Sequence, residues 1–306
     1  MSVARRIAML ALPMMIGFLS ADSADNPAIA IPPPAARPAS IPFNLHNGRL
    51  LVPLRINSSE PLSFLLDTGY GINMIHPDLI EPLKLQRAGK ITIVGIAGEE
   101  EAGTYSGALF DFDGITYSPR RLASLPSEAE NSRRRRDGIL GSGFFRRFVV
   151  EIDFAEKKLR LHEPESFKYT GQGEIIPLHF DKDTPVIDAA ILSPAGLVVR
   201  ARFEVDSGCD DYLCLAPEFV EANQLAGAQE SSGIKRGVGG GARIRYGTVP
   251  QLQLGRFTLA KPSANFFTDA SPAGKGLAGH IGIAALQHYK VILDYSHRQM
   301  ILEENR

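Results

Sequence analysis

Short apolar runs separated by turn residues follow one another along most of the chain, and the same order of runs occurs twice. In each half, two apolar runs are joined by a turn and lead into an acidic triplet. The runs are residues 51–56 and 62–66 in the first half, and 186–192 and 197–205 in the second. Apolar and β-branched runs joined by Asn, Ser, Pro or Gly predict β-hairpins. The chain is therefore predicted to be mainly β, with an internal duplication.

Three landmarks recur in the same order, each about 140 residues after its first copy. They are an Asp-Thr/Ser-Gly triplet, a glycine-rich tip between strand-like segments, and a short element bounded by glycines. In the first half they are Asp67, Thr68 and Gly69; Gly95, Ile96, Ala97 and Gly98; and Gly138, Ile139, Leu140 and Gly141. In the second half they are Asp206, Ser207 and Gly208; Gly237, Val238, Gly239, Gly240 and Gly241; and Gly279, His280, Ile281 and Gly282.

Strands and short helices are also expected between and after these landmarks. Each glycine-bounded element leads into a short helical segment and two strands, residues 148–153 and 158–161 in the first half, and 289–294 and 299–302 in the second. Two further short helices are predicted at 77–83 and 217–225. The hydrophilic segment 163–173 separates the halves, which predicts an N-terminal lobe at 43–165 and a C-terminal lobe at 172–306.

The first 23 residues predict a secretory signal peptide. Arg5 and Arg6 precede the apolar run 7–19, and small residues follow it. This run is shorter than the ~20 residues of a membrane span, although an uncleaved anchor is an alternative. Residues 24–42 are rich in Pro and Ala and predict an extended tether. We therefore expect an exported protein, periplasmic or extracellular, with no stable membrane span in the mature chain.

Composition and charge narrow the function classes. Lys and Arg number 33 against 34 Asp and Glu, for a net charge of −1, whereas nucleic-acid binders carry a basic surplus. Four consecutive arginines at 133–136 predict a solvated loop, with a processing site or an anionic docking patch as alternatives. The balanced charge predicts no nucleic-acid partner. No metal or cofactor is expected either, because no zinc-peptidase spacing of histidines occurs.

The two cysteines, Cys209 and Cys214, cannot form a disulfide framework or a four-thiolate zinc site. On an extended strand they would lie roughly 16 Å apart. That distance is too long for a disulfide unless the chain doubles back, so structural thiols are predicted. A redox-sensitive Cys209 beside the acidic triplet is the alternative.

Each triplet places an aspartate at the end of an apolar strand, where a carboxylate is costly unless it is hydrogen-bonded or functional. If the halves pack around a pseudo-two-fold axis, Asp67 and Asp206 meet and share one proton. The ionised member can then accept a proton from a water while the other donates to a carbonyl oxygen. The neighbouring residues support such a pair through tight turns, backbone N–H donors and hydroxyls that reach the opposite loop: Gly69, Gly208, Thr68 and Ser207.

With these motifs the chain resembles the aspartic peptidases of the pepsin and retropepsin family, and it is most similar to bacterial, exported, single-chain members with two retropepsin-like lobes. The likeness extends over about residues 41–304. It implies an all-β, bilobal acid protease fold: two β-barrel lobes related by a pseudo-two-fold axis, with a cleft between them. It also implies an aspartic endopeptidase, a hydrolase that acts on polypeptides as a monomer. The residues it assigns are the catalytic Asp67 and Asp206, the supporting Thr68, Gly69, Ser207 and Gly208, and the substrate-binding flaps at Gly95, Ile96, Ala97, Gly98, Val238, Gly239 and Gly240.

The chain departs from the family at several positions. Ser207 replaces Thr, and His280 stands where the family usually has an apolar residue. Tyr70 and Cys209 follow the two glycines, where acid-active members usually have Ser or Thr. Because neither Tyr70 nor Cys209 obviously replaces that hydroxyl, the ionised pair is expected to be less stabilised, which predicts a pH optimum nearer neutral than that of pepsin. A non-catalytic peptide-binding protein on the same fold is the alternative function, but the aspartates present in both triplets favour an enzyme.

Overall fold

The computed structural model describes residues 39–96, 98–125, 136–226 and 231–305. The predicted signal peptide, residues 24–38 of the predicted tether, Ala97 of the first flap and residues 133–135 of the arginine run lie outside this part of the chain. The described residues belong to one compact unit. Within them, no helix is both long enough and apolar enough to cross a bilayer.

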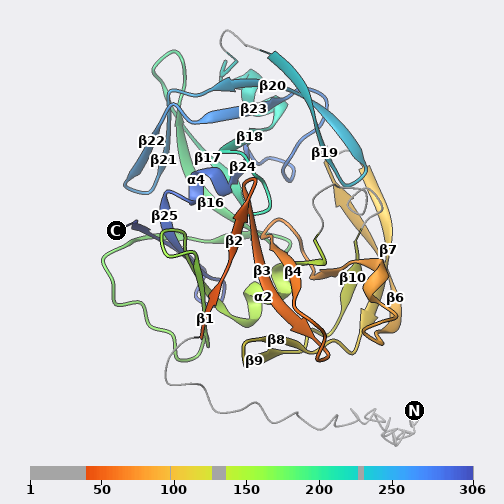
Figure 1. Cartoon of the computed structure of the whole chain (residues 1–306). Coiled ribbons are helices and arrows are strands. Elements are labelled where there is room, and N and C mark those ends of the chain that lie inside the picture. Colours follow the sequence, from red (N-terminus) through yellow and green to blue (C-terminus); the bar gives the residue numbers. More distant parts are fainter. Residues whose placement is uncertain (1–38, 97, 126–135, 227–230, 306) are drawn as a thin grey trace, which may run out of the picture. The chain divides into compact units, whose positions relative to one another are not determined.

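A first sheet of ten described strands is built from the first half of the chain (Figure 1). Its order is β6-β7-β10-β5-β11-β4-β3-β8-β9, and β2 pairs with β3. The strands are β2 (Asn44–His46), β3 (Arg49–Ile56), β4 (Leu62–Leu66), β5 (Met74–Ile75), β6 (Gln86–Gly95), β7 (Gly98–Ser106), β8 (Phe110–Phe112), β9 (Ile115–Tyr117), β10 (Leu122–Ser124) and β11 (Gly138–Leu140).

A second sheet of ten described strands has the order β19-β20-β23-β18-β24-β17-β16-β21-β22, and β15 pairs with β16. The strands are β15 (His179–Asp181), β16 (Thr184–Leu192), β17 (Val198–Asp206), β18 (Leu213–Leu215), β19 (Ser231–Gly237), β20 (Gly240–Thr248), β21 (Gln251–Leu254), β22 (Phe257–Ala260), β23 (Ser263–Phe267) and β24 (Gly279–Gly282). The two sheets repeat one topology, down to the parallel pairs β4–β11 and β17–β24. Each is an open path of strands, so the closed barrels expected for the lobes are not seen in the described residues.

A third sheet takes strands from both halves, in the order β1-β13-β12-β25-β26-β14. Its members are β1 (Ala39–Pro42), β12 (Val149–Asp153), β13 (Lys158–His162), β14 (Glu174–Pro177), β25 (Tyr289–Asp294) and β26 (Gln299–Glu304). The end of the predicted tether is therefore a strand, not an extended linker. Ile41 is buried there and Phe43 follows it into the core, while Pro42 is tolerated because β1 lies at the sheet edge.

Helices are few and short, as predicted: α2 (Ser142–Arg147), α3 (Pro217–Ala222) and α4 (Ile283–Leu286). The helix predicted at 77–83 is reduced to a 3₁₀ turn, η1 (Pro77–Leu79), and the one predicted at 217–225 ends at Ala222. Left-handed residues follow both helices, Lys84 (φ 56°) and Gln224 (φ 49°), which no α-helix continues through.

The same positions of the two sheets are filled differently. In the first half, strand β8 and helix α2 supply aromatic side chains in edge or tilted ring contacts: Phe110, Phe112, Phe144 and Phe145. In the second half the corresponding strand and helix supply smaller aliphatic side chains, such as Leu252, Leu254, Ala285 and Leu286. Both fillings are fully buried, so equivalent backbones are stabilised by different side-chain volumes.

Candidate active site

The two acidic triplets meet where β4 and β17 end. Asp67 follows β4 and is 5% exposed, and Asp206 is the last residue of β17. The two carboxyl groups are close enough that each shifts the pKa of the other. Each glycine faces the opposite carboxyl: a Cβ on Gly69 would lie 2.8 Å from Asp206 Oδ1, and one on Gly208 would collide with the Asp67 carboxyl. Only glycine leaves room for this approach.

Reciprocal hydrogen bonds join the two loops. The backbone N–H of Thr68 donates to Ser207 Oγ (3.1 Å), and the backbone N–H of Ser207 donates to Thr68 Oγ1 (2.9 Å). Each hydroxyl then donates onward to the strand before the opposite triplet, Thr68 to the Val205 carbonyl (2.6 Å) and Ser207 to the Leu66 carbonyl (3.0 Å). Both hydroxyls are buried, so these four bonds fix the spacing of the two carboxyl groups.

Backbone donors orient each carboxyl within its own loop. The N–H of Gly69 donates to Asp67 Oδ1 (3.0 Å), and the N–H of Gly208 donates to Asp206 Oδ1 (2.9 Å). These bonds are equivalent in the two halves. Backbone geometry alone therefore gives neither aspartate a preference for the charged form.

The electrostatics of the pair are nevertheless unequal. Burial, and then the negative charge of Asp206, raise the pKa of Asp67 well above its ordinary value. Burial would also raise the pKa of Asp206, but a hydrogen bond from His280 and the positive charge of that ring outweigh it, and the pKa of Asp206 is lowered. The two shifts are opposite in direction, so a shared proton favours Asp67 and the charge favours Asp206.

His280 and Glu204 were not among the residues that the sequence assigned to the site. His280 Nδ1 lies 3.1 Å from Asp206 Oδ2, and His280 Nε2 lies 2.9 Å from Glu204 Oε2. Two signals were available in the sequence. Glu204 precedes Asp206 by two positions, which places both on one face of a strand. His280 occupies an otherwise apolar position between the glycines of its landmark.

The two glycine-tipped hairpins, β6–β7 and β19–β20, have tips that touch each other. The last pair of facing residues is Gly95 with Gly98 in the first hairpin and Gly237 with Gly240 in the second. Gly239 has a φ of +82° and lies so close to Gly98 that a Cβ on it would strike the Gly98 backbone.

A residue at each tip packs against an apolar cluster of the other half of the chain. Val238 packs into the apolar cluster of the first half, which contains Leu65 and Ile139. Ile96 packs against the cluster of the second half, which contains Cys209 and Cys214. The structure thus brings the assigned flap residues Gly95, Ile96, Gly98, Val238, Gly239 and Gly240 together.

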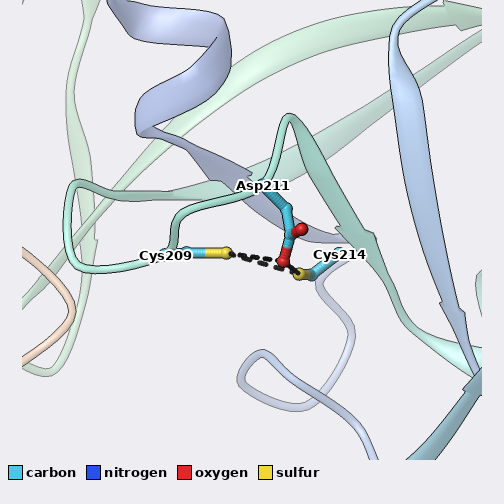
Figure 2. A group of neighbouring side chains, drawn as sticks. All are labelled: Cys209, Asp211 and Cys214. Atoms are coloured by element: carbon cyan, nitrogen blue, oxygen red, sulfur yellow. Dashed lines mark hydrogen bonds between the residues drawn. The ribbon is translucent and has the colours of Figure 1, made fainter. Parts of the chain in front are cut away.

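The cysteines contradict the expectation of an extended segment. The chain turns back between them, and Cys209 Sγ lies 3.4 Å from Cys214 Sγ. Both thiols are free and buried, as predicted for structural thiols. Figure 2 shows the Asp211 carboxylate beside the two sulfurs, with its Oδ2 at 3.8 Å from Cys209 Sγ and 3.6 Å from Cys214 Sγ. The predicted separation of roughly 16 Å is wrong because the segment is a turn, not a strand.

Two sulfurs and one carboxylate so close together could provide ligands for a soft divalent cation. A lysine already occupies this carboxylate: the Lys235 ammonium contacts Asp211 Oδ2 and lies 2.7 Å from Asp210 Oδ1. A metal ion would have to displace that ammonium, so the arrangement favours a neutralised ion pair behind two thiols.

Comparison with known proteins agrees with part of this site. Residues 52–144 match a family model described as aspartyl protease. The matched segment contains Asp67, the first flap and the first glycine-bounded element, while the second half of the chain lies outside it. No curated protein matches the chain. The segment around Asp67 is therefore similar to aspartyl proteases, which supports a peptidase-type activity, and Asp206 takes its place beside it through the repeated topology of this chain.

Proposed function

We propose that this protein is an aspartic endopeptidase in which Asp67 and Asp206 activate a water molecule between them. One observation carries the proposal: Asp67 and Asp206 stand at equivalent ends of two identically connected sheets, and each carboxyl group lies against the glycine of the opposite triplet. A buried carboxylate pair is expensive unless it has a partner or a task. The reciprocal Thr68–Ser207 bonds hold the pair in one geometry, as acid–base catalysis requires.

The reaction follows from the unequal protonation of the pair. Asp206 takes a proton from water as the water oxygen bonds to the carbonyl carbon, and Asp67 gives its proton to the carbonyl oxygen. A neutral tetrahedral diol results. When it collapses, the proton on Asp206 passes to the leaving nitrogen, the C–N bond breaks, and one diol hydroxyl returns its proton to Asp67. Both carboxyl groups end as they began.

The substrate in this proposal is an extended polypeptide held beneath the two flaps. A peptide in this place meets strand edges at the flap tips, where main-chain hydrogen bonding suits an extended backbone. One chain supplies both carboxyl groups, so we propose that a monomer is active. The signal-like N-terminus leads us to propose action outside the cytoplasm, periplasmic or extracellular.

The test is cleavage of an unbiased peptide library by the wild type and by Asp67→Asn and Asp206→Asn. Each variant should lose about 10²-fold or more in kcat/KM, because each removes one partner of the proton transfer. Asp188→Asn is the matched control, since Asp188 is exposed on β16 and should leave cleavage unchanged. Cleavage that survives both dyad variants would exclude this mechanism. Peptide binding without cleavage at any pH would instead favour a non-catalytic binding protein.

A further inference from the structure

A buried histidine joins Asp206 to a second acidic residue. The parallel pairing of β17 and β24 sets Glu204 opposite His280, so the imidazole lies directly behind the dyad. Its two ring nitrogens each have a carboxylate oxygen within ion-pair distance, from Asp206 on one side and Glu204 on the other. Glu204 is itself oriented by the backbone N–H of Gly274, which donates to its Oε1 (2.8 Å).

This geometry favours a positively charged ring, because both ring nitrogens lie at ion-pair distance from a carboxylate oxygen. The contact of Nε2 with Glu204 is an ion pair by distance and not a hydrogen bond, so its contribution is electrostatic. His280 and Glu204 are only 9% and 7% exposed, so water does not replace a missing partner. Burial by itself would lower the pKa of His280, but its contacts with Asp206, Cys209 and Glu204 outweigh that effect and raise the pKa well above its usual range.

The first half has the same backbone without this pair. The parallel pairing of β4 and β11 sets Leu65 opposite Ile139, the positions that correspond to Glu204 and His280. Both side chains belong to an apolar cluster beneath Asp67. Asp67 therefore has no cation in the position that His280 holds next to Asp206.

We propose that Glu204 and His280 are a positioning pair that keeps Asp206 ionised and thereby assigns the shared proton of the dyad to Asp67. The proposal rests on the proposed peptidase function and deepens it, because it makes Asp206 the group that deprotonates water and Asp67 the group that protonates the carbonyl. His280 provides the positive charge, and Glu204 keeps the ring charged and oriented. Neither residue needs to touch the substrate.

Other titratable groups surround the pair and must be kept constant in any test. Cys209 contacts the ring, and Cys214 lies opposite His280 on β18. More distant groups act on the dyad or on the thiols: Tyr70, Tyr295, Arg136, Asp211 and Lys235. A variant that changes only Glu204 and His280 leaves all of these in place.

The decisive variant gives the second half the residues of the first, Glu204→Leu with His280→Ile. Without the cation, Asp206 protonates at higher pH, so the acid limb of the kcat/KM profile should move up by about 1–3 pH units. At the low pH where the wild-type kcat/KM begins to rise, the kcat/KM of the double variant should be lower by about tenfold or more. Glu204→Gln, which keeps the shape of the side chain, should move the limb in the same direction by less. Ile139→Val, the matched change beneath Asp67, should leave the limb where it is.

A measurement that does not depend on activity covers the case in which the double variant fails to fold. In wild-type protein with ¹⁵N-labelled histidine, the His280 ring should give the two-proton imidazolium signature at pH 7–8, unlike exposed histidines. A neutral ring at that pH, or an unmoved acid limb in a folded double variant, would contradict the proposed role of Glu204 and His280. Cleavage that is insensitive to Asp67→Asn and Asp206→Asn overturns the peptidase itself, so the two failures are distinguishable.

Discussion

The residues beneath Asp67 and those beneath Asp206 occupy the same positions of two identically connected sheets, yet they differ in chemistry. Asp67 lies over Leu65, Ile139 and Met74, which are buried and apolar. Asp206 lies over residues of matching register that are charged or reactive: Glu204, His280 and Cys214. The loops above them are almost mirror copies in their hydrogen bonds. The backbone therefore builds the pair, and the layer of side chains below makes it asymmetric.

This asymmetry gives the two carboxyl groups different affinities for the shared proton. Two adjacent buried carboxyl groups of equal basicity would share the proton without preference. A cation next to one of them separates their roles, and a second carboxylate stabilises that cation in a low-dielectric interior. Acid–base catalysis gains from the separation because one group is ready to accept a proton while the other is ready to donate one.

Removing one member of the buried Glu204–His280 pair should have the largest effect on the free energy of unfolding. His280→Ile alone leaves Glu204 and Asp206 buried without a cation, which should cost about 3–5 kcal/mol of stability at pH 7. The double change to Glu204→Leu and His280→Ile should recover most of this loss, since it replaces the pair by an apolar contact. Urea denaturation of both variants measures the difference. Equal losses would mean that the charge on the pair is irrelevant to stability.

The next largest effect on stability is expected from truncating an aromatic and an aliphatic core side chain at equivalent positions of the two sheets. Phe110→Ala should cost about 3–5 kcal/mol, because Phe110 is fully buried among Phe64, Phe112 and Tyr117. Its counterpart Leu252 should cost less, about 2–4 kcal/mol when changed to Ala. Thermal melts followed by circular dichroism check the order. A reversed order would show that the second sheet relies more heavily on its core than side-chain volume predicts.

The two aspartates should have opposite effects on stability. The pKa of Asp67 is raised in the folded state, so this residue lowers stability once the pH exceeds its pKa in the unfolded state. Asp67→Asn should therefore stabilise the protein at pH 7. A lowered pKa means that Asp206 contributes stability above its unfolded value, which is lost as pH falls through the folded value, so Asp206→Asn should destabilise at pH 7. Each effect should be on the order of 1 kcal/mol. Melting temperatures that move in the same direction at pH 7 would contradict the assigned protonation.

A smaller effect is expected at the flap tips. Gly239→Ala places a Cβ against Gly98 and strains a φ of +82°, so the tips should separate and KM should rise about three- to tenfold with little change in kcat. Gly107→Ala is the control, because Gly107 has a similar φ of +85° with no atom near its missing Cβ. Steady-state kinetics on one peptide distinguish them. An equal rise in KM for both would assign the effect to backbone strain alone.

The smallest effect is expected from exposing Cys209 and Cys214 to an oxidant. A disulfide requires the sulfurs to approach from 3.4 Å to about 2.05 Å. The contact with the Cys214 thiol, and then burial, raise the pKa of Cys209 well above its ordinary value. Oxidised glutathione should therefore join Cys209 and Cys214 slowly at pH 7 and faster at higher pH, with two thiols oxidised and glutathione reduced. Intact mass and thiol titration follow the reaction. Rapid modification at neutral pH would contradict the buried placement.

Much of the scaffold could be predicted from the sequence because its signals are local. Alternating apolar residues and turn residues located the hairpins around β3–β4 and β16–β17, and the repeat predicted two copies of one topology. Predictions were wrong where local signals compete with tertiary packing. The Pro-rich end of the tether forms β1 because Ile41 can be buried, and Cys209 and Cys214 lie together because their segment is a turn.

By itself the sequence determined the mainly β class, the duplicated order of strands and the two acidic triplets, since each depends on periodicity or on residues adjacent in the chain. Only the tertiary structure decided which aspartate lies next to a histidine ring. That choice depends on Glu204 and His280, which lie 76 positions apart in the numbering and meet through the pairing of β17 and β24. Ion pairing inside a protein depends on distance and burial, and neither is encoded in any short stretch of sequence.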